Sequence, residues 1–180
     1  ACSSSLTCVS VARHSLLAGE CEAALVCGAN LQLQPYWSQA FAAAGMLSPT
    51  NRCRFGDDAA DGYVRGEGVG VVQIEITTEA TRHASCEIAG VGVGQDGRSN
   101  GMTAPNPVAQ VAVVGSAYDS ANSKAAVAML EAHGTGTKLG DPIELGALGE
   151  CRLGSSAEYL RCASIKSNLG HLEGSSGLAG

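Results

Sequence analysis

The sequence predicts an α/β protein in which helices cover both faces of the sheets. Short apolar runs of strand length alternate along the chain with segments that show helical spacing or helix caps. The runs are continuously apolar rather than alternating, which is typical of strands buried on both faces. A chain of 180 residues that is 45% hydrophobic is also long enough to bury a core.

The helices are predicted from apolar spacing, caps and stop signals. A loose helical period runs from Leu6 to Leu17 after a serine-rich start, so that Cys2 lies at the helix N-terminus and Gly19 ends the helix. Asp141 is predicted as an N-cap with Pro142 at the first helical position. In all, helices are expected over residues 6–17, 36–49, 108–121, 141–151 and from 170 onward.

Strands are predicted where short apolar runs end at turn residues or at polar clusters. The expected strands cover residues 22–30, 69–76, 86–94, 126–132 and 162–165. The last two end directly before His133 and Lys166. The segments 54–68 and 95–107 are rich in glycine and charge, and we predict that they form loops.

Charge and hydropathy exclude two classes of partner. The chain has 11 basic and 17 acidic residues, with the basic ones scattered, so we expect no nucleic-acid binding. No apolar stretch reaches the roughly 18–20 residues that a membrane-spanning helix needs, which predicts a cytoplasmic location, with an organelle as the alternative. Both ends interrupt a pattern, so we expect the central fragment of a longer domain, inactive and poorly folded by itself.

Three patterns that resemble cofactor or metal sites are set aside. The segment "GVGQDG" matches a dinucleotide fingerprint, but turn residues follow it instead of a helix, so no directly bound cofactor is predicted. The segment "DDAADG" lacks the glutamate that closes a calcium loop. The eight cysteines include no C-x-x-C pair and no histidine at zinc spacing, so we expect no metal site and mostly buried thiols.

Three polar clusters lie at the ends of predicted elements, where open α/β sheets place their functional sites. They are Cys2 with the serines that follow, His133 in "HGTGT", and the segment "KSNLGHLE". Taken singly, each cluster is more often structural than functional. His14 and His83 belong to no cluster, and we interpret both as structural.

In combination with other segments, these clusters resemble a known family. Six segments occur in the order and at about the spacing found in β-ketoacyl synthases: "ACSSSL", "GMLSP", "DGYVRGEG", "QDGRSNGMTAPN", "EAHGTGTKLGDPIE" and "KSNLGHLEG". The closest resemblance is to the ketosynthase domains of type I polyketide synthases, with the condensing domain of a fatty acid synthase as the alternative. The resemblance implies a thiolase-like fold of layered α-β-α-β-α type. Residues 1–50 would end its N-terminal half, and 51–180 would belong to its C-terminal half.

The resemblance also implies a decarboxylative condensation of thioesters. Cys2 would accept an acyl chain from an acyl carrier protein, and its place at a helix N-terminus would favour the reactive thiolate. The backbone N–H of Cys2 would contribute to an oxyanion hole. His133 and His171 would donate hydrogen bonds to the enolate oxygen that forms when a malonyl thioester loses carbon dioxide.

Further roles are carried over from the family. Lys166 would supply a positive charge near the site, and Glu173 would be its counter-charge, because a buried lysine without a partner is costly. Thr135 and Thr137 would contact the phosphopantetheine arm that carries the substrates, or would order the loop. The complete domain would be a homodimer. Two alternatives from other classes stay open, namely a papain-like cysteine hydrolase that uses Cys2 and one histidine, and a non-catalytic thiolase-fold scaffold.

Overall fold

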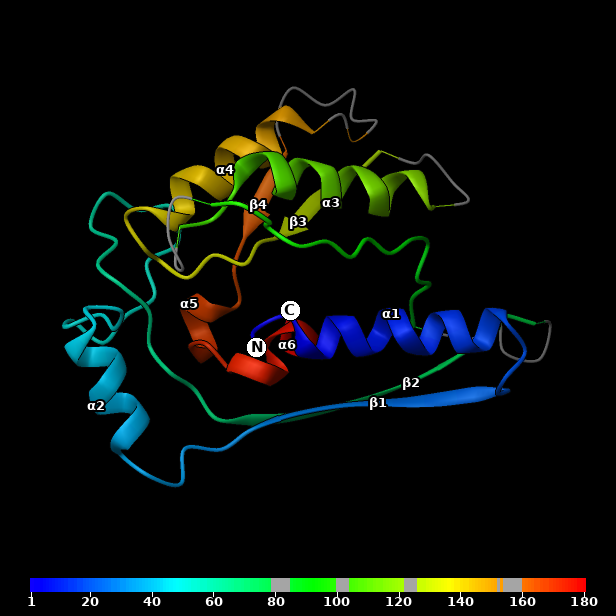
Figure 1. Ribbon diagram of the computed structural model, residues 1–180, viewed down its shortest axis with the longest axis horizontal. Coiled ribbons are helices and arrows are strands. Elements are labelled where there is room, and N and C mark those ends of the chain that lie inside the picture. Colours follow the sequence, from blue (N-terminus) through cyan, green and yellow to red (C-terminus); the bar gives the residue numbers. More distant parts are fainter. Residues whose placement is uncertain (79–84, 100–103, 122–125, 152, 154–159) are drawn as a thin grey trace.

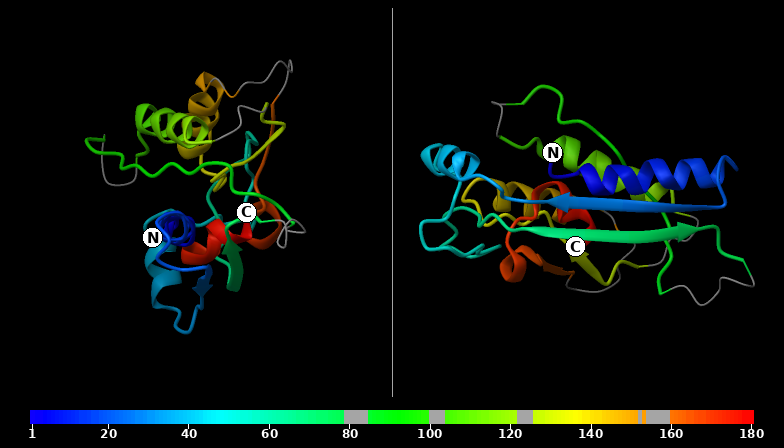
Figure 2. Two further views of the ribbon diagram at one scale, coloured as in Figure 1. Left: turned by 90° about the vertical axis from the view of Figure 1, so that its right-hand side faces the viewer. Right: turned by 90° about the horizontal axis from the view of Figure 1, so that it is seen from below.

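The computed structural model describes residues 1–78, 85–99, 104–121, 126–151, 153 and 160–180 (Figure 1). His83 lies outside the described residues. Within them, the elements fall into two groups, one built on an antiparallel pair of strands and the other on a parallel pair. Figure 2 shows these two groups one above the other, joined by loops and short helices.

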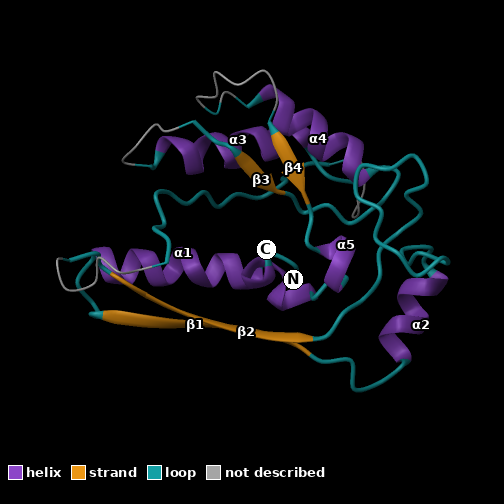
Figure 3. Ribbon diagram, turned by 180° about the vertical axis from the view of Figure 1, so that it is seen from behind, coloured by secondary structure: helices purple, strands orange, loops and turns teal. Residues whose placement is uncertain are grey.

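The first group is an antiparallel pair of strands covered by one long helix. β1 (Ala23–Asn30) pairs with β2 (Gly68–Glu75), and α1 (Ser4–Leu17) runs along one face of the pair (Figures 1 and 3). Val26 is only 3% exposed on the covered face, whereas Leu25 on the opposite face is 70% exposed. The prediction of strands buried on both faces is therefore wrong for β1, because the side chains alternate and residues of this chain cover one face only.

The second group contains a parallel pair of strands and two long helices. β3 (Met129–Glu131) pairs with β4 (Arg161–Ala163), and α4 (Gly140–Glu150) lies between them in the chain and packs against α3 (Pro107–Asp119). Asn106 caps α3 by accepting hydrogen bonds from two backbone N–H groups of its first turn. Because parallel strands end at the same edge, the residues that follow β3 and β4 are brought together.

Short elements connect the two groups near this edge. α2 (Tyr36–Ala43) lies at one end of the molecule, while α5 (Lys166–Leu169), a 3-10 turn, η1 (Glu173–Ser175), and α6 (Ser176–Ala179) lead back to α1 (Figure 1). A Cβ added to Gly28 of β1 would lie 3.0 Å from Cα of Ser175 and 3.1 Å from Cβ of Ser5. The absence of a side chain at residue 28 therefore allows β1, α1 and η1 to meet closely.

One predicted strand is not formed. The described part of the segment 86–94 takes part in no strand ladder and instead lies along α3. A Cβ at Gly90 or Gly92 would meet backbone carbonyl oxygens of that helix. The alternate glycines thus allow the extended chain to approach α3 closely.

The cysteines also differ from expectation. All eight are described and free, but only Cys53 is buried, while Cys8, Cys27 and Cys86 are exposed. His14 lies on α1 as predicted, where its Nδ1 is 2.8 Å from the carbonyl oxygen of Ser10. No helix in the described part of the chain has the length and apolarity needed to cross a bilayer.

Candidate active site

Cys2 and His171 are in direct contact although they stand at opposite ends of the chain. The Nε2 atom of His171 lies 3.2 Å from Sγ of Cys2. Cys2 precedes α1 by two residues, and His171 lies in the turn between α5 and η1. The docking of α6 and η1 against α1 therefore brings the two side chains together.

His133 faces the same place from the end of β3. Its ring centroid is 5.5 Å from that of His171, with the two rings nearly perpendicular at 84°. Both histidines and Cys2 line a cavity of about 910 Å³, together with Thr135 and Thr137. The structure thus places the predicted nucleophile, both predicted hydrogen-bond donors and both predicted substrate-binding threonines around one cavity.

Hydrogen bonds fix the tautomer of His171. The backbone N–H of Glu173 donates to Nδ1 over 3.1 Å, and the Ser176 hydroxyl lies 2.7 Å from the same atom. Because an amide N–H can only donate, Nδ1 is an acceptor and the ring proton is on Nε2. Burial lowers the pKa of His171 to about 4, with His133 and Lys166 adding to the effect. At neutral pH, His171 therefore presents a neutral imidazole with its N–H toward the sulfur.

The turn that carries His133 is held by a carboxylate for which no role was predicted. The backbone N–H groups of His133 and Gly134 donate to the two oxygens of Glu144, over 2.6 and 2.9 Å. Burial lowers the pKa of His133, and the Lys166 ammonium lowers it further. Glu144 follows Asp141 by three residues in α4, so the two lie on one helix face. This spacing is the feature of the sequence from which a role for Glu144 could have been predicted.

Asp141 is not the helix cap that the sequence predicts. Asp141 is 3% exposed, and its carboxylate accepts from the backbone N–H groups of Gly56 and Gly136, both over 3.0 Å, and of Thr137 over 3.3 Å. The hydroxyl of Thr137 accepts from the N–H of Gly140 over 3.0 Å, at the start of α4. Thr137 therefore orders the first turn of the helix, while Asp141 joins two loops.

Lys166 is buried at the start of α5, with 6% of its surface exposed. Burial lowers its pKa, and the carboxylates of Glu131 and Glu144 oppose that effect. The expected partnership with Glu173 is not found.

Glu173 instead forms an ion pair with Arg65, whose Nε lies 2.5 Å from Oε1 and whose Nη2 lies 3.0 Å from Oε2. Glu173 does not line the main cavity. Arg65 stands in a bridge with His171, so its side chain emerges beside residue 173. Arg65 belongs to the "DGYVRGEG" segment, but no role was predicted for it.

The thiol of Cys2 experiences opposing influences. Burial raises its pKa, which is the largest effect, and the Glu173 carboxylate raises it further, while the Lys166 ammonium lowers it. Burial therefore opposes the lowering that we expected from the helix N-terminus. The N–H of His171 that points at the sulfur provides a donor that favours the thiolate.

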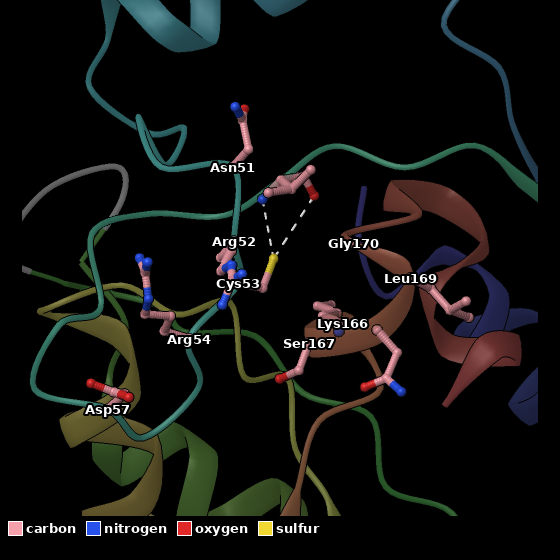
Figure 4. Close-up of a pocket in the computed structure, with 11 residues that line it drawn as sticks. Asn51, Arg52, Cys53, Arg54, Asp57, Lys166, Ser167, Leu169 and Gly170 are labelled. Atoms are coloured by element: carbon pink, nitrogen blue, oxygen red, sulfur yellow. Dashed lines mark hydrogen bonds between the residues drawn. The ribbon is translucent and has the colours of Figure 1, made fainter.

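A second cavity of about 480 Å³ lies beside Lys166 and contains Cys53 (Figure 4). Its sulfur accepts from the backbone N–H of Val64 over 3.1 Å, and burial raises the pKa of the thiol. Cys53 is thus a buried, hydrogen-bonded thiol with a structural role. Within the described ranges, no three histidine, cysteine, aspartate or glutamate side chains are grouped so that they could hold a metal ion.

Two family profiles together match almost the whole chain. The profile described as "Beta-ketoacyl synthase, N-terminal domain" matches residues 1–80. The profile described as "Beta-ketoacyl synthase, C-terminal domain" matches residues 85–180.

Curated relatives resemble the chain over its full length. One component of the phenolphthiocerol/phthiocerol polyketide synthase of Mycobacterium tuberculosis is 48% identical over 186 residues, which cover 100% of this chain and 10% of the relative. Another component of the same synthase is 48% identical over 187 residues, which cover 100% of this chain and 8% of that relative. The chain therefore spans about a tenth of the length of the curated relatives that it matches.

Solved structures share the fold. The ketosynthase from module 6 of the bacillaene synthase of Bacillus subtilis 168 superposes with a TM-score of 0.90 at 37% identity, over 99% of this chain and 33% of that one. The oxazolomycin ketosynthase domain of Streptomyces albus JA3453 superposes with a TM-score of 0.89 at 35% identity, over 99% of this chain and 32% of that one.

Proposed function

Because the chain belongs to the β-ketoacyl synthase family, we propose that it catalyses the decarboxylative Claisen condensation of polyketide chain elongation. Its fold is the thiolase-like α/β fold of that family, present here as part of a domain. The contact of Cys2 with the Nε2–H of His171, beside His133 in one cavity, is the observation that carries the proposal. The relatives and structures described above belong to polyketide synthases, which supports the polyketide pathway over fatty acid synthesis.

The first half-reaction is acyl transfer to Cys2. The thiolate attacks the carbonyl carbon of an acyl thioester, a new carbon–sulfur bond forms, and the carrier sulfur leaves as a thiolate when the old carbon–sulfur bond breaks. The Nε2–H of His171 stabilises the sulfur anion before the attack. The backbone N–H of Cys2 is the proposed donor to the oxyanion of this step.

The second half-reaction needs a stabilised enolate. The carbon–carbon bond to the carboxylate of a malonyl-type extender breaks, carbon dioxide leaves, and the electron pair delocalises onto the thioester oxygen. Neutral imidazoles of His133 and His171 donate to that oxygen. The enolate carbon then attacks the acyl thioester on Cys2, and the Cys2 thiolate leaves. Removal of one such donor typically costs about 10²–10³ in rate.

Lys166 acts on this step through its charge. Burial lowers the pKa of both histidines, and the Lys166 ammonium adds to this effect, which favours their neutral forms. The proposed roles of Thr135 and Thr137 are contacts with the phosphopantetheine arm, supported by their position on the cavity wall. Thr137 combines this role with its hydrogen bond to the start of α4.

The proposed partner is an acyl carrier protein, which presents both substrates on phosphopantetheine, and the complete domain is proposed to be a homodimer. The division of the chain near residue 50 stays a prediction. The two family profiles themselves meet between residues 80 and 85.

The test separates the two half-reactions in the complete protein. His133→Ala is expected to keep acyl loading on Cys2, seen by peptide mass spectrometry, and to slow elongation by about 10²–10³. His14→Ala, on the exposed flank of α1, is the matched control and should leave both steps unchanged. Loss of loading with decarboxylation intact would reverse the assigned roles.

Two outcomes would favour the other classes of function. Release of free acid from activated esters, without elongation, would indicate a cysteine hydrolase. Product formation by a Cys2→Ala variant would indicate a scaffold.

A further inference from the structure

We infer that Arg65 is a positioning residue, which holds Glu173 in a left-handed backbone conformation so that the Glu173 N–H can donate to Nδ1 of His171. The ion pair between Arg65 and Glu173 would thus select the ring tautomer that donates from Nε2. The part of the inference that concerns the rate of decarboxylation rests on the proposed function.

The backbone of Glu173 is in an uncommon conformation. Its φ is +43°, and Asn51 is the only other non-glycine residue with a positive φ in the described part of the chain. Residues with a Cβ populate this region sparsely and stay there only when their surroundings hold them. Glutamate also lacks the short side chain that allows asparagine to adopt this conformation more easily.

Arg65 provides that hold because its guanidinium is itself fixed. It binds both carboxylate oxygens of Glu173, and its Nη1 donates to the Ser38 hydroxyl over 2.8 Å. The guanidinium carbon also lies 5.2 Å from the ring centre of Phe41. The side chain of Arg65 is 7% exposed, against 24% for Glu173. Because the buried, planar guanidinium binds both oxygens of the carboxylate, it fixes both the position and the orientation of that carboxylate.

The backbone joins the same two segments. The N–H of Gly66 donates to the carbonyl of His171 over 2.9 Å, and the N–H of His171 donates to the carbonyl of Val64 over 2.6 Å. This ladder sets the register between residues 65 and 171. Starting from that register, the Arg65 side chain reaches residue 173, and the amide of residue 173 returns to the His171 ring.

The amide is the group that selects the tautomer. The Ser176 hydroxyl can either donate to Nδ1 or accept from it, so it is compatible with both tautomers. The Glu173 N–H can only donate, and it therefore requires an unprotonated Nδ1. If residue 173 turned away, the ring proton could move from Nε2 to Nδ1, where the Ser176 hydroxyl would accept it, and Nε2 would no longer be a donor toward the cavity.

The experiment uses the complete protein and a rescue by glycine. Arg65→Met removes the ion pair, and the double variant Arg65→Met/Glu173→Gly also removes the need for it, because glycine adopts a positive φ freely. The probe is malonyl-acyl carrier protein, with decarboxylation followed as release of carbon dioxide. Hydrogen exchange of a peptide that contains residue 173 reports the amide hydrogen bond independently of activity.

Arg65→Met is expected to slow decarboxylation and to accelerate exchange at residue 173, each by about tenfold, which equals the roughly 1.4 kcal/mol typical of a left-handed residue. The double variant should return both to within about threefold of the parent protein. Arg54→Met breaks the separate Arg54–Asp61 ion pair, at 3.4 Å, and should change neither.

Two results would overturn the inference, namely unchanged exchange and decarboxylation in Arg65→Met, or a double variant as impaired as the single one. If the variants show the expected exchange rates but the parent protein releases no carbon dioxide, the proposed function is refuted while the positioning role of Arg65 stands. If Arg65→Met does not fold, Arg65→Lys keeps the charge without the fork, and an unchanged exchange rate at residue 173 in that variant would also overturn the inference.

Discussion

Replacing Asp141 by asparagine is expected to loosen the loop that carries His133. The buried carboxylate accepts from three backbone N–H groups, with Oδ2 receiving Gly56 and Oδ1 receiving Gly136 and Thr137. Asparagine can keep one oxygen in place, but its NH₂ group must then face the N–H of Gly56. One hydrogen bond becomes a contact between two donors.

The size of the effect follows from these bonds. Loss of a hydrogen bond to a charged group costs about 1.5–3 kcal/mol, and neutral bonds are about half as strong as charge-assisted ones. With one bond lost and two weakened, Asp141→Asn should destabilise the local structure by about 3 kcal/mol. Asp141→Ala leaves all three buried donors without an acceptor and should cost about 5 kcal/mol.

Peptide-level hydrogen exchange of the complete protein is the appropriate assay, because it reads local opening in a large chain. A loss of about 3 kcal/mol predicts about a hundredfold faster exchange in peptides covering 54–57 and 134–137. Asp58→Asn, an exposed acid in the same loop, is the control and should change little. Acceleration of less than about threefold in Asp141→Asn would refute the reasoning.

Three further outcomes are expected. The pKa of His171 is about 4 in the folded protein and 6.5 ordinarily, so the unfolded chain binds more protons between these two pH values. Local stability should therefore fall by about 2 kcal/mol from pH 7 to pH 5. Hydrogen exchange at residues 171–176 measures this loss, and an equal loss in His171→Asn would contradict the reasoning. Lys166→Met removes a charge that lowers the pKa of His133 and His171, so the acid limb of the decarboxylation pH profile should move upward; an unmoved limb would show that the charge acts elsewhere. Gly136→Ala places a Cβ 2.6 Å from the backbone nitrogen of Arg54 at a φ of +72°, and should raise protease sensitivity through a loss of about 2–4 kcal/mol, whereas Gly146→Ala meets nothing within 4 Å inside α4 and should be neutral or stabilising.

Local patterns in the sequence were sufficient for most elements. Apolar runs predicted β1, β2, β3 and β4 to within a few residues, and the spacing and caps predicted α1 and α3. The pattern failed at 86–94, where an apolar run with alternate glycines lies against a helix instead of forming a ladder. The periodicity of a segment can be read from its own residues. Which segment forms hydrogen bonds with its backbone depends on the fold.

The sequence by itself predicted the type of chemistry that we propose, because a cysteine, two histidines and a lysine stand in motifs that resemble one family. Only the tertiary structure decided which side chains orient them. Gly56 meets Asp141 across 85 residues, Arg65 meets Glu173 across 108, and Cys2 meets His171 across 169. Buried carboxylates and guanidinium groups need partners, and those partners can be far away in the sequence. The fold sets which donors and charges lie within reach, and no local pattern contains that information.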